Sequence, residues 1–105
     1  MRQFDVYTNP SLSTCTALPF IVDIQNPIIS ELATRIVIPL GRMAYFKNEQ
    51  FAGLTPIIEY EDEKLLLLTV QIASIPTKRL KKPVGSLAYF RDEIISSLDF
   101  AITGI

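Results

Sequence analysis

The 105-residue sequence contains no histidine and no tryptophan, and it has a single cysteine, Cys15. One cysteine cannot form an internal disulfide framework, and without a histidine it lacks the usual base that activates a nucleophile. Glycine is also scarce: the four glycines are scattered, so no glycine-rich loop for phosphate is present. These absences leave no catalytic constellation and no spaced set of metal ligands. We therefore expect neither a cofactor nor a metal.

An excess of positive charge is lacking as well. Ten Lys and Arg residues face eleven Asp and Glu residues, for a formal net charge of -1. Proteins that bind nucleic acid non-specifically depend on a basic surface, so this activity is not expected. The longest apolar run, residues 65–76, is broken by three polar residues and is shorter than the ~20 residues that span a bilayer. Because residues 1–10 also lack the apolar core of a secretory signal, we expect a cytoplasmic protein without membrane contact.

Several β-strands are predicted by the residues that are present. Residues 3–7 alternate, with Phe4 and Val6 on one face, as in a half-buried strand. Residues 20–25 form a second β-rich run, and residues 35–40 form a nearly continuous apolar run that suits a strand buried on both faces. Pro39 cannot donate to a ladder, so this strand should end, bulge or lie at an edge there. Residues 56–60 and 64–71 predict a hairpin around a solvated acidic turn at 61–63.

After Pro83 the spacing of apolar residues changes from a period of two residues, typical of strands, to a period of about 3.6 residues, typical of helices. The apolar positions with this spacing are Leu87, Phe90, Ile94, Leu98 and Ala101. A helix from an N-cap at Ser86 to about Thr103 would be roughly 25 Å long. Gly104 lies where helices often end in left-handed geometry. Residues 1–105 therefore predict one mainly β domain, a small barrel or sheet followed by a long C-terminal helix.

Two segments are suited to a partner. The chain ends in "FAITGI", which is either packed into the protein's own core or presented to another molecule. Most termini are polar and poorly ordered, so apolar residues here require an explanation. The segment "TKRLKK", residues 77–82, carries four cations and predicts an exposed basic loop. The acidic residues 61–63 are interpreted as a solvated turn rather than a metal site.

Five segments, in order, resemble the CcdB family of bacterial toxins: "QFDVYTN", "FIVDIQNPII", "TRIVIPL", "ASIP" and "FRDEIISSLDFAITGI". The resemblance runs along essentially the whole chain, and it is weakest at residues 41–53. It implies an SH3-like β-barrel with a long C-terminal α-helix, assembled as a homodimer. It also implies a toxin that binds the A subunit of DNA gyrase and traps the cleaved DNA complex. A CcdA-like antitoxin neutralises such toxins, and operator DNA is bound only together with that antitoxin.

The resemblance also implies which residues bind gyrase. The family's toxic surface corresponds here to Ile28 and Ile29, and to the helix end with Gly104 and Ile105. Two further positions of this surface depart from the familiar pattern: Thr103 stands where the family has tryptophan, and Asp99 where it has asparagine. Adjacent residues of a strand face opposite ways, so one of the two isoleucines is expected in the core. Without the resemblance, the favoured interpretation of Ile105 is a latch onto its own domain, because isoleucine is more often buried.

Three functions remain open at this stage. The leading interpretation is a gyrase-poisoning toxin that is not an enzyme. The second is a ribonuclease toxin on the same barrel, for which Arg35, Arg42 and the basic run are the visible candidates. The third is a non-toxic module that binds the antitoxin for operon control. A fold does not by itself decide among them.

Overall fold

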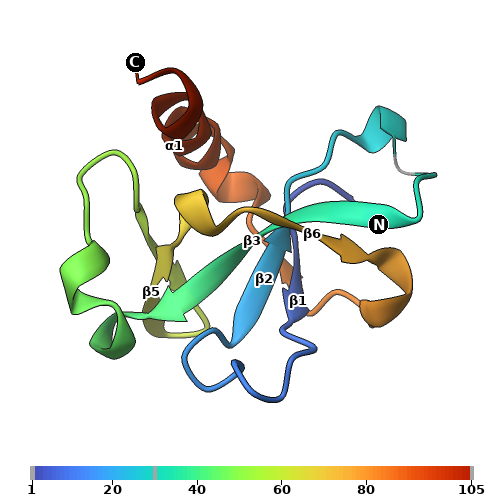
Figure 1. The fold of residues 1–105 in the computed structure, drawn as a ribbon, viewed down its shortest axis with the longest axis horizontal. Helices are drawn as coiled ribbons and strands as arrows, with labels where there is room; N and C mark the ends of the chain where they lie inside the picture. Colours follow the sequence, from blue (N-terminus) through green and yellow to red (C-terminus); the bar gives the residue numbers. More distant parts are fainter. Residues whose placement is uncertain (1, 30, 105) are drawn as a thin grey trace.

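The computed structural model describes residues 2–29 and 31–104. These residues form a curled antiparallel sheet and one C-terminal α-helix (Figure 1). The strands are β1 (Asp5–Thr8), β2 (Phe20–Asp23), β3 (Thr34–Arg42), β4 (Ile57–Tyr60), β5 (Glu63–Leu67), β6 (Ala73–Pro76) and β7 (Gly85–Ser86), and the helix is α1 (Arg91–Thr103). Six short 3₁₀ turns, η1 to η6, connect them. The mainly β class with a long C-terminal helix is therefore confirmed.

The sheet curls into a half-barrel around β3. Its strand order is β4-β5-β3-β2-β1-β7, and β6 pairs with the remaining part of β3. The two end strands approach each other where the Tyr60 ring lies over Gly85, so closely that a Cβ at Gly85 would overlap the tyrosine hydroxyl. The same ring packs edge-on against Phe20 at a centroid distance of 5.1 Å. Gly85 is required here for space, because no side chain fits beneath the tyrosine.

The expectation for Pro39 was wrong. β3 neither ends nor bulges at this residue, but continues to Arg42 in the middle of the sheet. On one edge β3 pairs with β6 through residues 34–37 and then with β5 through residues 40–42. Pro39 lies where one partner replaces the other, and its carbonyl still accepts a bond from the Leu68 amide at 3.0 Å. The Leu68 carbonyl, which a donor at residue 39 would have reached, accepts instead from the Gln71 amide at 2.9 Å, so the missing N–H of Pro39 leaves no acceptor unpaired there.

The predicted hairpin is confirmed, with a shorter second strand. β4 and β5 pair from Ile57–Leu66 to Tyr60–Glu63 around a turn of Glu61 and Asp62. Both turn residues have positive φ, 51° and 62°, which is the geometry of a tight hairpin turn matched to the strand twist. The expected strand to residue 71 instead ends at Leu67, and residues 69–71 form the 3₁₀ turn η4.

One face of the sheet holds the main core, and α1 covers it. Val6, Ile38, Leu65 and Ile94 are fully buried there, together with Leu87. The helical segment begins as the 3₁₀ turn η6 (Ala88–Phe90), and the α-helix itself starts at Arg91. Ser86 accepts a bond from the Ala88 amide at 3.1 Å, so it caps the 3₁₀ turn rather than the α-helix. The last predicted stripe residue, Ala101, is exposed.

The opposite face is buried too, which corrects the expectation of a half-buried first strand. Tyr7 of β1 is only 1% exposed and packs with Ile21, Val37, Ile75 and Leu80. The cover comes from β6 and the segment that follows it, far away in the sequence from β1. The tyrosine hydroxyl has no hydrogen-bond partner among the described residues, and burial raises the pKa of Tyr7 above 10.0.

Candidate functional site

The first part of the predicted site is the 3₁₀ turn η1 (Pro27–Ile29), directly after β2. Ile28 is 86% exposed and Ile29 is 43% exposed. The expectation that one of them is in the core was wrong, because these residues form a turn that leaves the sheet and not a strand with alternating faces. The structure thus presents both isoleucines to solvent.

Local chemistry explains why the chain turns here. The Asn26 side chain accepts a bond from the Ile28 amide at 2.9 Å, which is an Asx turn, and Pro27 fixes its own φ. The Asn26 carbonyl accepts a second bond from the Ile29 amide at 3.1 Å. The Gln25 side chain then bonds the Ile29 carbonyl at 2.8 Å. Sequence reasoning ended the second β-rich run at residue 25 but assigned no role to the Gln25 side chain.

The second part of the predicted site is the end of α1. Asp99 and Thr103 are exposed, and the Thr103 hydroxyl donates to the Asp99 carbonyl at 2.6 Å. Gly104 adopts left-handed geometry at φ 75°, and its amide donates to the Phe100 carbonyl at 2.9 Å. The helix therefore ends at the predicted glycine cap. Ile105 lies outside the described residues.

The residues of "FAITGI" that the structure describes are presented rather than buried. Phe100 is 44% exposed and Ile102 is 77% exposed. Phe100 lies beside the loop at Gly53, where an added Cβ would be 3.5 Å from the phenylalanine ring. Neither residue was predicted as part of the site. Their exposure could have been predicted from the sequence, because neither position belongs to the helical stripe of apolar residues that faces the core.

The two parts of the site are separate within one chain. Figure 1 shows the end of α1 and the turn after β2 well apart along the long axis of the molecule. The structure therefore does not bring Ile28 and Ile29 into one continuous surface with Thr103 and Gly104.

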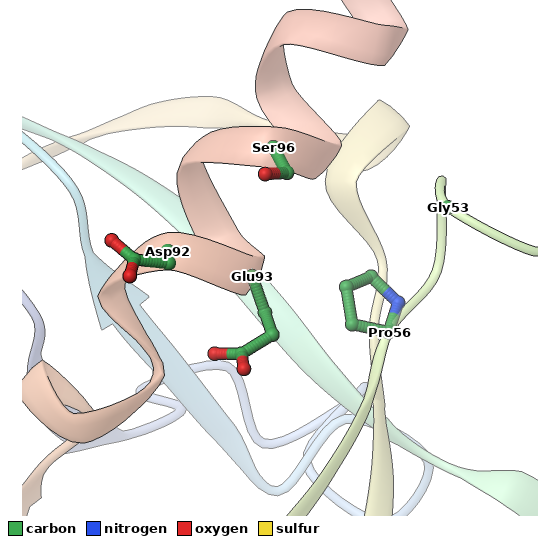
Figure 2. A pocket seen from close by; sticks show the side chains of 5 residues that line it. All are labelled: Gly53, Pro56, Asp92, Glu93 and Ser96. Carbon is green, nitrogen blue, oxygen red and sulfur yellow. The ribbon is translucent and has the colours of Figure 1, made fainter.

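A cavity of about 370 Å³ next to α1 offers no catalytic arrangement. It is lined by Gly53, Pro56, Asp92, Glu93 and Ser96. Figure 2 shows the carboxylates of Asp92 and Glu93 pointing in different directions rather than toward a common point. Across residues 2–29 and 31–104, no three His, Cys, Asp or Glu side chains are grouped to hold a metal ion. No described helix combines the length and the apolar character that crossing a membrane requires.

The basic loop is exposed as predicted. It begins with the 3₁₀ turn η5 (Thr77–Arg79), and all four of its cations are at the surface: Lys78, Arg79, Lys81 and Lys82. Arg79 and Lys81 line a cavity of about 200 Å³ together with Leu12, which is 92% exposed. The loop offers a positive surface beside an exposed apolar side chain.

The comparison with protein families agrees with this architecture. A family model described as CcdB protein matches residues 3–104. The chain belongs to the CcdB family. Membership implies a toxin of a toxin–antitoxin module, and the curled sheet with its C-terminal helix agrees with the fold that the resemblance implied. Against the familiar CcdB pattern, Thr103 and Asp99 remain the two departures at the helix end.

Proposed function

We propose that this CcdB-family protein poisons DNA gyrase by binding its A subunit through the η1 turn and the end of α1. The observation that carries the proposal is the exposure of apolar side chains at both places. Ile28 and Ile102 are 86% and 77% exposed. Exposed apolar clusters on a small soluble domain commonly mark protein–protein contact sites.

The mechanism requires no catalysis by the toxin. A ligand shifts an equilibrium only by its difference in affinity for the two states. The toxin would therefore bind the cleaved gyrase–DNA complex more tightly than the resealed one. Thr103 lacks the ring with which the family's tryptophan can stack on an arginine, a contact of about 0.5–2 kcal/mol. Phe100 and Ile102 supply exposed apolar area on the same helix end.

A CcdA-like antitoxin is the proposed neutralising partner. Lys78, Arg79, Lys81 and Lys82 form an exposed positive surface that suits an acidic, disordered segment. Operator DNA would be bound only by toxin and antitoxin together, since the toxin alone has a net charge of -1. Loss of neutralisation in a variant with these cations replaced by serine would support this surface, and unchanged neutralisation would exclude it.

A homodimer is proposed with the outer half of α1 near the twofold axis. Leu87 and Ile94 belong to the core of their own chain, so they are not available for a partner. Phe100 and Ile102 are assigned above to gyrase, so the dimer contact is assigned to Val70, which is exposed in the turn η4 (Thr69–Gln71) that packs against α1. Sedimentation should give the mass of a dimer at tens of micromolar, and a strictly monomeric mass would contradict the proposal.

The ribonuclease alternative is disfavoured by the position of its candidate residues. Arg35 is fully buried and pairs with Asp23 at 2.7 Å. Arg42 is half-buried and its charge is paired with Glu63 at 3.0 Å.

One assay separates the three functions. The protein is incubated with gyrase, supercoiled DNA and ATP, and separately with RNA. Gyrase-dependent double-strand breaks that persist after denaturation would support the poison, and RNA cleavage would support the ribonuclease. A protein that does neither, yet binds a CcdA-like antitoxin, would be the non-toxic module.

A further inference from the structure

The point at which β2 leaves the sheet is bridged by a side chain. β2 and β3 pair up to Asp23 and Val37, and the Ile24 amide still bonds the Ile36 carbonyl at 2.9 Å. The next ladder bond is made by the Gln25 carboxamide, whose Oε1 accepts from the Ile36 amide at 3.0 Å. The main chain is thereby released to turn outward without leaving the Ile36 amide unpaired.

The other end of the same carboxamide reaches the presented turn. Gln25 Nε2 donates to the Ile29 carbonyl at 2.8 Å. The Ile29 carbonyl also accepts from the Leu32 amide, at the longer distance of 3.4 Å. The side-chain carboxamide of Gln25 thus links β3 to η1 much as a backbone peptide group would. Its oxygen accepts from β3 and its nitrogen donates to the turn.

Burial fixes the orientation of this bridge. Gln25 is only 1% exposed, and its backbone N–H donates to Asp23 Oδ1 at 2.9 Å. Asp23 is in turn held by Arg35, whose Nε and Nη2 lie 2.8 and 2.7 Å from Oδ2. A buried polar group of this kind has no water to replace a lost partner, so its geometry is narrowly determined.

We propose that Gln25 is a positioning residue for target recognition, holding the η1 turn so that Ile28 and Ile29 face outward. This inference rests on the proposed gyrase contact of η1. Asn26 and Pro27 shape the turn locally, but their bonds lie within it or next to it along the chain. Gln25 connects the turn to β3, and therefore determines where the turn points relative to the rest of the toxin.

The test uses two substitutions of Gln25 and one control. Gln25→Met keeps the length of the side chain but removes both hydrogen bonds. Gln25→Asn keeps the amide but is one methylene too short to reach Ile29 and Ile36 together. The control is Ile58→Val, which trims a fully buried residue of β4 in the main core. Thermal melting of all three proteins establishes whether their losses of stability are comparable.

Two readouts follow. Amide hydrogen exchange at Ile29 and Ile36 should accelerate at least tenfold in both Gln25 variants relative to Ile58→Val at a similar melting temperature. Binding to the isolated gyrase A subunit should weaken at least tenfold in the Gln25 variants and less than threefold in the control. If Gln25→Met does not fold, Gln25→Asn provides the same comparison.

The outcomes distinguish the inference from the function on which it rests. Unchanged exchange in the Gln25 variants would overturn the inference whatever gyrase does. Faster exchange with unaltered binding would also overturn it, because recognition would then not depend on the orientation of the turn. If the unsubstituted protein fails to bind gyrase A, the proposed function fails. The exchange data then decide only whether Gln25 holds the turn, and a positioning role toward gyrase is excluded.

Discussion

Deletion of Thr103, Gly104 and Ile105 should abolish gyrase-dependent DNA cleavage and leave the fold intact. Thr103 and Gly104 are exposed, and the two bonds known to be lost join them to Asp99 and Phe100 at the surface. Water replaces such partners, so the free energy of unfolding should fall by about 1 kcal/mol or less. For a domain of this size the melting temperature should then drop by no more than about 5 °C.

The effect on gyrase binding should be larger. Truncation of a central apolar contact typically costs about 2 kcal/mol or more, which is roughly a thirtyfold loss of affinity. Thermal melting and DNA cleavage are measured on the same truncated protein. Leu12→Ser is the matched surface control, because Leu12 is 92% exposed and lies in a different loop. It should leave both the melt and the cleavage unchanged.

A variant with a truncated buried side chain shows how large a loss of stability would be if the terminal residues belonged to the core. Ile94→Ala removes a fully buried side chain of α1 and should cost about 2–5 kcal/mol. A truncated protein whose melting temperature falls as far as that of Ile94→Ala would show that the terminal residues are a latch on their own domain. Retention of cleavage by the truncated protein would equally refute the reasoning.

Three further predictions concern stability. Asp23→Ala should lower the free energy of unfolding by about 3–5 kcal/mol in urea denaturation, because it removes the carboxylate that pairs with the buried Arg35 guanidinium, and a loss below 1 kcal/mol would contradict this. Gly85→Ala should cost about 1–3 kcal/mol, because the added methyl overlaps Tyr60, and Lys82→Ala, at an exposed position of the preceding loop, serves as the control in the same melt. Burial raises the pKa of Tyr7 above 10.0, so the unfolded state loses the phenolic proton at a lower pH than the folded state does. The contribution of this group to stability is therefore fully present below pH 10.0 and declines as the pH rises further. Tyr7→Phe should reduce this decline in pH-dependent melting.

Much of the fold was predictable because it depends on residues close together in the chain. The change of period after Pro83 predicted the helix, and Gly104 predicted its end. The β4–β5 hairpin followed from two apolar runs around a polar turn. These features depend on backbone sterics and on neighbours within a few residues, which a local pattern contains.

The candidate site was predictable in its residues but only in part in their surroundings. The family resemblance identified Ile28 and Ile29, whereas the alternation rule wrongly buried one of them because a strand was assumed. Phe100 and Ile102 were overlooked, because a sequence does not state how far along a helix the core extends. Leu98 packs against the main core, whereas Phe100 and Ile102 beyond it are exposed.

The sequence alone determined the order of strands and helix and the position of the helix cap. Tertiary structure decided which of these residues are buried. Tyr7 is covered because β6 and the segment after it fold over β1, and Pro39 is tolerated because β3 changes partner from β6 to β5 there. Asp23 and Arg35 neutralise each other only because neighbouring strands place them together. Burial depends on segments that are remote in the chain, and their meeting is a property of the whole fold rather than of any local pattern.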